Sequence, residues 1–349
     1  MSRGNFSGYL VLVVLVVGLV GCAATEKVDF VVPVWPGPPE VARYEFSGVL
    51  RTDNDITGAG RGVMERLSGV EGVSESPLFS KPYDVAARNG VVLVSDTVSR
   101  VVHMLVLPTR SIFRIGRSSG DGALTKPTGV ALDGNGLIYV ADTTGRMVKV
   151  YEPNTHYLMT IGGPDLFVRP TDVAVNEDGT RIYVVDAGGV ESNSHQIQMF
   201  NEEGVLLKTI GARGGADGEF NLPTQAAVNA QGELFVLDAG NFRVQVFTAE
   251  GEYLRSWGKV GRNTGDFSRP RGLAIDAEGL IYVTDTAYGN FQVFRDDGQL
   301  MLAVGKSGAD LPGEYSLPAG IAADEMGWVY ILDQRYNKLE VIEKLKVEE

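Results

Sequence analysis

One motif determines the architecture of this chain: it reads Pro127-Thr128-Gly129-Val130-Ala131, then Gly136-Leu137-Ile138-Tyr139-Val140-Ala141-Asp142. The pattern returns as Pro270-Arg271-Gly272-Leu273-Ala274, then Gly279-Leu280-Ile281-Tyr282-Val283-Thr284-Asp285. Self-similarity at a fixed period is the signature of a repeat architecture. The sequence therefore predicts six related copies. Their opening prolines are Pro82, Pro127, Pro170, Pro223, Pro270 and Pro318, and their closing aspartates are Asp96, Asp142, Asp186, Asp238, Asp285 and Asp333.

Each copy has the pattern of short β-strands. The closing aspartates follow one another at steps of 46, 44, 52, 47 and 48 residues. Within a copy, apolar and polar residues alternate, as in Phe242-Arg243-Val244-Gln245-Val246-Phe247, and turn signals such as Asp297-Gly298 separate the apolar runs. Repeats of roughly 40–50 residues with four strands each are typical of propeller blades. We expect an all-β propeller.

The fourth copy is also similar to a known repeat. It contains Leu234-Phe235-Val236-Leu237-Asp238, then Asn241-Phe242-Arg243-Val244-Gln245-Val246-Phe247, then Trp257-Gly258. These residues resemble the NHL repeat, and the resemblance extends from about Lys81 to Ile342. It implies a six-bladed β-propeller.

The two ends of the repeat region predict how the ring closes. Copy six stops after Leu339-Glu340-Val341-Ile342 and lacks its last strand. The segment 43–51 has the pattern of that missing strand. We predict that 43–51 pairs with 338–343, so that the propeller domain spans 43–349. Closure would remove a long exposed sheet edge.

The N-terminus resembles the signal of bacterial lipoproteins. An apolar run extends from Tyr9 to Val20. Its end overlaps Leu19-Val20-Gly21-Cys22, which is similar to a lipobox. This resemblance implies a signal peptide over 1–21, a lipid on Cys22 and anchoring to a membrane. The Pro-rich segment 22–42 would be an extended tether. The alternative is an uncleaved anchor, although the apolar run is shorter than the roughly 20 residues of a span.

Composition limits the partners. The formal net charge is −13, which disfavours nucleic acid as a partner, and the single cysteine excludes a disulfide and a RING domain. The chain also resembles NHL lipoproteins of Gram-negative bacteria. That resemblance implies a place in the cell envelope, either periplasmic or at the outer membrane and surface, with envelope proteins as partners, multihaem cytochromes among them.

Catalytic signals are weak. The three histidines, His103, His156 and His195, occupy different positions in the repeat, so symmetry does not bring them together as zinc ligands. The Gly-rich segments 211–215 and 258–261 lack the strand–loop–helix context of a phosphate loop. Because all six copies carry the closing aspartate, we interpret it as scaffold that accepts backbone N–H bonds.

Candidate site residues are sought where the copies differ. Two positions after the opening proline, three copies have glycine, whereas the others have Asp84, Asp172 and Gln225. These oxygen-bearing side chains could bind a hard cation such as Ca²⁺, or the two acids could pair with the basic residues that precede four of the prolines. The basic residues are Lys81, Lys126, Arg169 and Arg269, and they could instead bind an anionic partner.

The function we expect is a protein-interaction scaffold that uses one face of the ring and needs no cofactor. Two insertions, 52–80 and 188–195, could supply recognition loops or be tolerated additions. The alternative function is a divalent-metal-dependent lyase or hydrolase with its site at the channel mouth, using Asp84 and Asp172.

Overall fold

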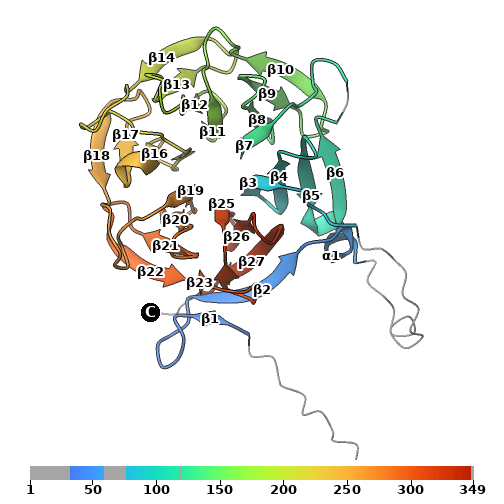
Figure 1. Ribbon diagram of the computed structural model, residues 1–349. Helices are drawn as coiled ribbons and strands as arrows, with labels where there is room; N and C mark the ends of the chain where they lie inside the picture. The colour runs from blue at the N-terminus through green and yellow to red at the C-terminus, as the bar shows by residue number, and fades with distance from the viewer. Residues whose placement is uncertain (1–31, 59–75, 118, 347–349) are drawn as a thin grey trace, which may run out of the picture. The chain divides into compact units, whose positions relative to one another are not determined.

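The computed structural model describes residues 32–58, 76–117 and 119–346. The compact unit runs from Pro33 to Glu349. Within it, the described residues form six antiparallel sheets arranged as a ring (Figure 1). The predicted six-bladed all-β propeller is therefore confirmed. Cys22, the signal segment 1–21 and Met64-Glu65-Arg66-Leu67 of the first insertion lie outside the described residues.

Each blade has four main strands, ordered from the central channel outward. The innermost strands are β3 (Pro82–Arg88), β7 (Pro127–Leu132), β11 (Pro170–Val175), β15 (Gln225–Val228), β19 (Pro270–Ile275) and β25 (Pro318–Ala323). The second strands are β4 (Val91–Asp96), β8 (Ile138–Asp142), β12 (Ile182–Asp186), β16 (Leu234–Asp238), β20 (Ile281–Asp285) and β26 (Trp328–Asp333).

The outer half of each blade follows the same order. The third strands are β5 (Val101–Val106), β9 (Met147–Tyr151), β13 (Gln196–Phe200), β17 (Arg243–Phe247), β21 (Asn290–Phe294) and β27 (Lys338–Lys344). The outermost strands are β6 (Ser111–Ile115), β10 (Tyr157–Ile161), β14 (Leu206–Ile210), β18 (Tyr253–Trp257), β22 (Leu300–Val304) and β2 (Tyr44–Leu50). The remaining elements are β1 (Val34–Trp35), β23 (Lys306–Ser307), β24 (Glu314–Tyr315), α1 (Asp53–Thr57), η1 (Leu107–Thr109) and η2 (Ala239–Asn241).

The ring closes through the N-terminal strand, as predicted. Strand β2 pairs with β27 in antiparallel register, from Tyr44 opposite Lys344 to Leu50 opposite Leu339. The boundary of the compact unit differs from the prediction. Val34 and Trp35, which we assigned to an extended tether, form β1 and pair with Glu45 and Tyr44, so the last blade has five strands.

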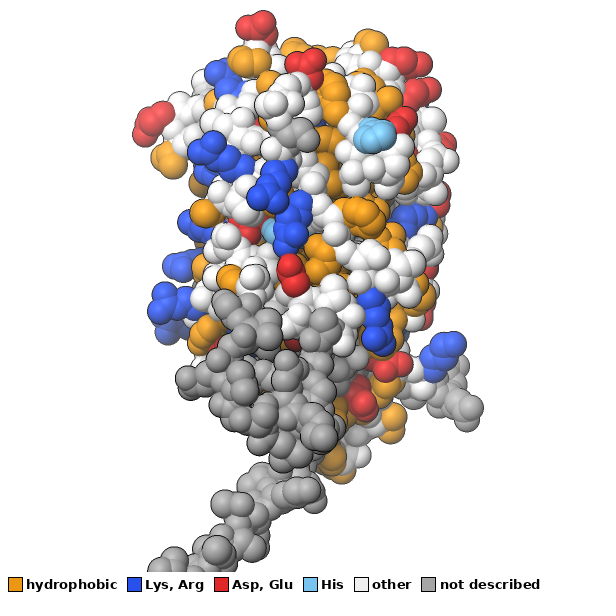
Figure 2. Space-filling model, turned by 90° about the vertical axis from the view of Figure 1, so that its right-hand side faces the viewer, with side chains coloured by type: hydrophobic (Ala, Val, Ile, Leu, Met, Phe, Trp, Pro, Cys, Tyr) orange, Lys and Arg blue, Asp and Glu red, His pale blue; other side chains and the backbone are white. Residues whose placement is uncertain are grey.

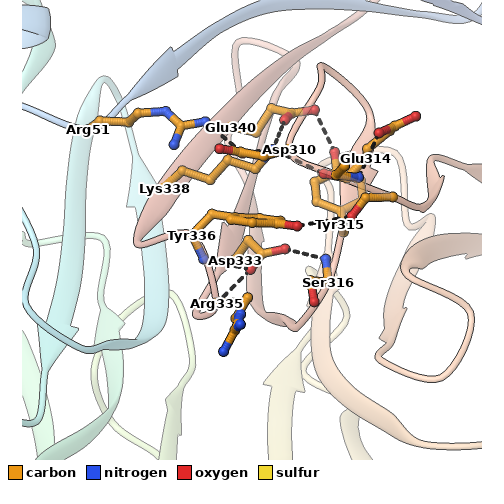
Figure 3. A network of polar contacts seen from close by, with 12 residues as sticks. Arg51, Asp310, Glu314, Tyr315, Ser316, Asp333, Arg335, Tyr336, Lys338 and Glu340 are labelled. Carbon is orange, nitrogen blue, oxygen red and sulfur yellow. Dashed lines mark hydrogen bonds and ion pairs between the residues drawn. The ribbon is translucent and has the colours of Figure 1, made fainter.

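A buried ion-pair network reinforces this closure (Figure 3). The ammonium of Lys338 lies 3.0 Å from Glu340 and 3.2 Å from Asp310, and the Lys338 and Glu340 side chains are both fully buried. Asp310 also accepts a 2.7 Å hydrogen bond from Arg51, just beyond β2. Hydrogen bonding to Arg51 and Lys338 outweighs the effect of burial and lowers the pKa of Asp310. The N-terminal segment is therefore attached to the last blade by charge as well as by sheet pairing.

The hydrophobic core lies between neighbouring blades. The apolar side chains of each sheet pack on those of the next, as Met104 of β5 packs with Ile138 and Val140 of β8. A buried large apolar side chain lies three residues before every opening proline and fills the space under each connection between blades. These residues are Phe79, Leu124, Phe167, Phe220, Phe267 and Tyr315. The repeat thus fixes the backbone just before each innermost strand.

The closing aspartates have the scaffold role that the repeat predicts. Each is fully buried. Asp142 accepts backbone N–H bonds from Thr125 at 2.6 Å, from Lys126 at 2.9 Å and from Gly145 at 3.0 Å. Asp285 accepts the equivalent bonds from Ser268, Arg269 and Ala287. One carboxylate therefore holds the start of the innermost strand to the turn that follows the second strand.

Candidate functional site

The innermost strands present the three exceptional polar residues at one mouth of the channel. Asp84 lies in the β-bulge between Pro82 and Val85 of β3, and Asp172 is the first paired residue after the register shift of β11. Gln225 begins β15. A bulge inserts an extra residue and redirects its side chain. Asp84 is 2% exposed and Asp172 is 3% exposed. The repeat thus turns these side chains away from solvent.

Hydrogen bonds link two of these residues directly and tie all three to neighbouring blades. The amide of Gln225 donates to Asp84 Oδ1 at 2.6 Å, which joins the fourth blade to the first. Asp84 Oδ2 accepts the N–H of Val130 at 3.2 Å, and Asp172 Oδ2 accepts the N–H of Ala226 at 2.8 Å. Gln225 Oε1 accepts the N–H of Leu273 at 2.7 Å. Each side chain therefore bonds to the backbone of the next blade.

Two glycines make room for the acids. A Cβ atom on Gly129 would lie 2.2 Å from Asp172 Oδ1, and a Cβ atom on Gly320 would lie 2.6 Å from Asp84 Oδ1. Each glycine belongs to the blade that precedes the acid around the ring. The residue at this position in one blade therefore limits the residue in its neighbour, because an aspartate in one blade needs a glycine in the blade before it.

Burial changes the protonation of the two acids. Desolvation raises the pKa of Asp84 to about 6, although the hydrogen bonds from Val130 and Gln225 oppose this rise. Desolvation and the nearby charge of Asp84 raise the pKa of Asp172 well above its ordinary value. Raised pKa values favour the protonated form of a carboxyl group. The channel mouth therefore holds one carboxyl group that can donate a proton beside one that can accept a proton.

The basic residues before the prolines do not pair with these acids, contrary to one of the two interpretations above. Lys81, Lys126, Arg169 and Arg269 are exposed, and their side chains form no ion pair within the described residues. The cation that acts on Asp84 is Arg271, which the sequence reasoning missed; its guanidinium lies 5.2 Å from the centre of the Tyr83 ring. We call the four exposed cations the basic row.

The backbone of every residue in the basic row is fixed. Each backbone N–H donates to the buried closing aspartate of its own blade, at 3.0 Å for Lys81, 2.9 Å for Lys126 and 2.7 Å for Arg169. The N–H of Arg269 makes the same contact with Asp285 at 3.1 Å. Because a proline follows each cation, φ of the next residue is fixed too. The row therefore presents charged side chains from a rigid frame.

The channel between the innermost strands is narrow and apolar. A cavity of about 150 Å³ is lined by small side chains, among them Ala86, Ala131, Ala174, Ala227, Ala274 and Ala322, one from each blade. Within residues 32–58, 76–117 and 119–346, no group of three or more His, Cys, Asp or Glu side chains is placed to hold a metal ion. In the same ranges, no helix has the length and apolar character of a membrane span.

The histidines are dispersed, as their sequence positions predict. His103 is buried in β5, and desolvation lowers its pKa to about 4. His156 lies exposed in the turn between β9 and β10. His195 is buried at the end of the 188–195 insertion, where its ring contacts the carbonyl of Gly189 and accepts the N–H of Leu222. That part of the insertion is therefore structural.

Comparison with known proteins identifies the repeats. The model of the NHL repeat matches residues 220–247 and 267–295, which cover the fourth and fifth blades from the buried Phe to the third strand. The chain is an NHL-repeat β-propeller. No curated protein matches this NHL propeller.

Solved structures share the fold of the NHL propeller at low identity. A protein of unknown function from Bacteroides thetaiotaomicron is 19% identical, with a TM-score of 0.58 over 78% of this chain and 72% of that one. A gluconolactonase from Xanthomonas campestris is 16% identical, with a TM-score of 0.57 over 76% and 86%. Virginiamycin B lyase from Staphylococcus aureus is 11% identical, with a TM-score of 0.55 over 86% and 100%. These likenesses concern the fold alone.

Proposed function

We propose that this NHL propeller is a lipid-anchored protein of the cell envelope that binds an acidic partner protein through its basic row. The observation that carries the proposal is the combination of fixed backbones and unpaired side chains at Lys81, Lys126, Arg169 and Arg269. A charged side chain without an internal partner loses no existing ion pair when it binds. A fixed backbone reduces the conformational entropy that binding costs.

The envelope setting is proposed from the resemblance of the N-terminus to lipoprotein signals, with Cys22 as the lipidated residue. Under this proposal the lipid holds the propeller at a membrane, and the segment that follows Cys22 gives it reach. Envelope proteins are the proposed partners, and multihaem cytochromes are one class among them. Labelling with a radioactive or clickable fatty acid tests the anchor, since Cys22→Ser would abolish incorporation.

The partner proposal is tested by crosslinking in the intact envelope. The test variant combines Lys126→Glu with Arg269→Glu, and we expect it to lose the crosslinked partner that the wild-type protein retains. The matched control reverses two cations of the outer strands, Arg114 and Lys208, so that the net charge changes equally. Retention of the same partner by the test variant would refute the role of the basic row.

The channel mouth supports a second candidate, a metal-dependent lyase or hydrolase. The observation that favours it is the pair of buried acids with raised pKa values, Asp84 and Asp172, of which Asp84 accepts a hydrogen bond from Gln225. Ca²⁺ with these oxygens as ligands is the cation that this candidate would use. Elemental analysis of the purified protein separates the two candidates. Stoichiometric Ca²⁺ that is lost in an Asp84→Asn variant would favour the enzyme.

A further inference from the structure

The antiparallel order of the strands gives the ring two chemically different faces. The connections between blades, the opening prolines and the turns between second and third strands lie on one face. The turns between first and second strands, and between third and fourth strands, lie on the other. We call the first the basic face, because it carries the basic row, and the second the acidic face.

Exposed cations predominate on the basic face. Among the described residues, the exposed acids in its loops are Asp55, Asp121, Asp165, Glu191 and Asp217, because the closing aspartates are buried. The exposed cations are Lys81, Arg100, Arg117, Lys126, Arg169, Arg213, Lys259, Arg262, Arg269, Lys306 and Arg335. The described residues of this face therefore expose more cations than acids, although the chain as a whole carries a net charge of −13.

The acidic face has the opposite composition. Its turns expose the cations Arg43, Arg110, Arg295 and Lys346. The exposed acids of its hairpin turns are Glu177, Asp178, Glu202, Glu203, Glu250, Glu252, Glu278, Asp296, Asp297 and Glu325. The separation is visible from the side of the ring, where Lys and Arg gather toward the left edge and acids are frequent along the right edge (Figure 2).

The charges on both faces lie in two concentric rows. Near the channel, the basic row lies on one face, and the turns between first and second strands place Glu177, Asp178, Glu278 and Glu325 on the other. Toward the rim, the connections between blades carry Arg117, Arg213, Lys259, Arg262 and Lys306. The turns between third and fourth strands carry Glu202, Glu203, Glu250, Glu252, Asp296 and Asp297. Opposite charges therefore lie at similar radii on the two faces.

The acidic face also has carboxylates without an internal ion pair in the described part of the chain, and a surface cavity opens on it. Glu202, Glu203 and Glu250 form no ion pair within the described residues. A cavity of about 730 Å³ opens between the turns of the fourth and fifth blades. It is lined by Arg295 and by four carboxylates that already pair with Arg255 or Lys344, namely Glu233, Asp276, Glu278 and Asp296.

We propose that the acidic face is an interaction surface for a second copy of this chain, whose basic face docks on it. The rings would stack head to tail along the channel axis. Such a contact joins two different surfaces. When the successive copies share one axis, the assembly cannot close on itself, so further copies can be added to form longer stacks. The proposal goes beyond the proposed function because it assigns a role to the acidic face, while it also uses the basic row.

Sedimentation velocity of the full-length chain in mild detergent tests this stacking. We expect the sedimentation coefficient to increase with protein concentration at about 20 mM salt and the increase to disappear near 500 mM, where the Debye length falls to a few ångströms. A basic-face variant combines Lys126→Glu, Arg169→Glu and Arg269→Glu. An acidic-face variant combines Glu202→Lys, Glu203→Lys and Glu250→Lys.

Each variant alone is expected to remain a single ring, because the three reversals cancel most of the net charge on one of its two faces and remove the attraction between them. An equimolar mixture is expected to associate again, because the unchanged basic face of one variant meets the unchanged acidic face of the other. This recovery cannot come from misfolded protein. A wild-type chain that stays monomeric at low salt would overturn the proposal, and so would variants that associate as the wild type does.

The acidic-face variant also separates this inference from the proposed function. It leaves the basic row intact, so it should lose self-association and keep the envelope partner. If the wild type stacks but loses no partner on reversal of the basic row, the proposed function fails while the stacking stands.

Discussion

The hydroxyl groups of Tyr44 and Tyr282 lie 3.1 Å apart in the interior, which joins the closing strand β2 to the fifth blade. Tyr282 donates its own proton to Asp276 at 2.8 Å, so Tyr44 is the donor to Tyr282. Both rings are buried. The N-terminal strand is therefore bonded to the sheet beside the last blade as well as to the last blade itself.

Removal of the Tyr44 side chain should loosen this closure. Tyr44→Phe leaves the ring packing and should lower the free energy of unfolding by about 1 kcal/mol, the net worth of one hydrogen bond. Tyr44→Ala also leaves a cavity and should lower it by about 3–5 kcal/mol. Urea denaturation followed by tryptophan fluorescence measures both. Equal effects of the two substitutions would contradict packing as the main contribution.

Lys338 should be more costly to remove alone than together with its partner. Lys338→Met leaves the fully buried Glu340 without its cation, and we expect a loss of about 3–5 kcal/mol. Lys338→Met combined with Glu340→Gln removes the stranded charge and should recover part of that loss. A double-mutant cycle by urea denaturation measures the difference, and additive effects would show that the two charges are not coupled.

The closing aspartates should be sensitive to loss of their oxygens. Asp285→Ala leaves the partly buried N–H groups of Ser268 and Arg269 without their acceptor, at a cost of about 1 kcal/mol for each lost hydrogen bond. Asp285→Asn keeps one acceptor oxygen and should cost less. Thermal unfolding ranks the two variants. An alanine variant as stable as the wild type would remove the basis for the fixed backbone at Arg269.

Gly129 should tolerate no side chain. Gly129→Ala places a Cβ atom 2.2 Å from Asp172 Oδ1, and the overpacking should cost about 1–3 kcal/mol. Gly37→Ala is the matched control, because no atom lies within 4 Å of its added Cβ. Urea denaturation compares the two. Equal stability of both variants would show that the channel mouth adapts without cost.

The acids at the channel mouth predict a dependence of stability on pH. Folding raises the pKa of Asp84 from 3.8 to about 6 and also raises the pKa of Asp172, so the folded chain binds these protons more tightly than the unfolded chain. This contribution to stability is complete below about pH 4 and is lost as the pH rises through about 6. Asp172→Asn should therefore raise the free energy of unfolding at pH 8 relative to the wild type.

The comparison at low pH completes this test. At pH 4 the wild-type Asp172 is already protonated, so Asp172→Asn should have little effect there. Asp178→Asn, in an exposed turn, controls for the change in net charge. A gain in stability that is equal at pH 4 and pH 8 would show that the protonation of Asp172 is not its cause.

Most of the fold was predictable because it repeats. The residues from Pro127 to Asp142 define strand length, turn position and blade order, and the same pattern returns around the ring. The closure of β2 on β27 was predictable because copy six lacks a strand. Strand β1 was missed because Val34 and Trp35 lie among prolines, and only pairing with β2 makes two residues a strand.

The candidate site was less predictable because its contacts join distant parts of the chain. Asp84, Asp172 and Gln225 could be singled out as departures from the repeat. The bond between Gln225 and Asp84 spans 141 residues, and no local pattern indicates it. The expected partners of the acids were their sequence neighbours, whereas the bulges turn the carboxyl groups toward the backbone of the next blade.

The pairing of Tyr44 with Lys344 also bears on how the protein is made. Apart from the two-residue β1, strand β2 has no sheet partner until β27 has been synthesised, after the strands of all the intervening sheets. A chain cut short before that point would leave β2 and the final sheet with open edges, which chaperones and proteases recognise. The last pairing therefore forms only after β27 has been synthesised.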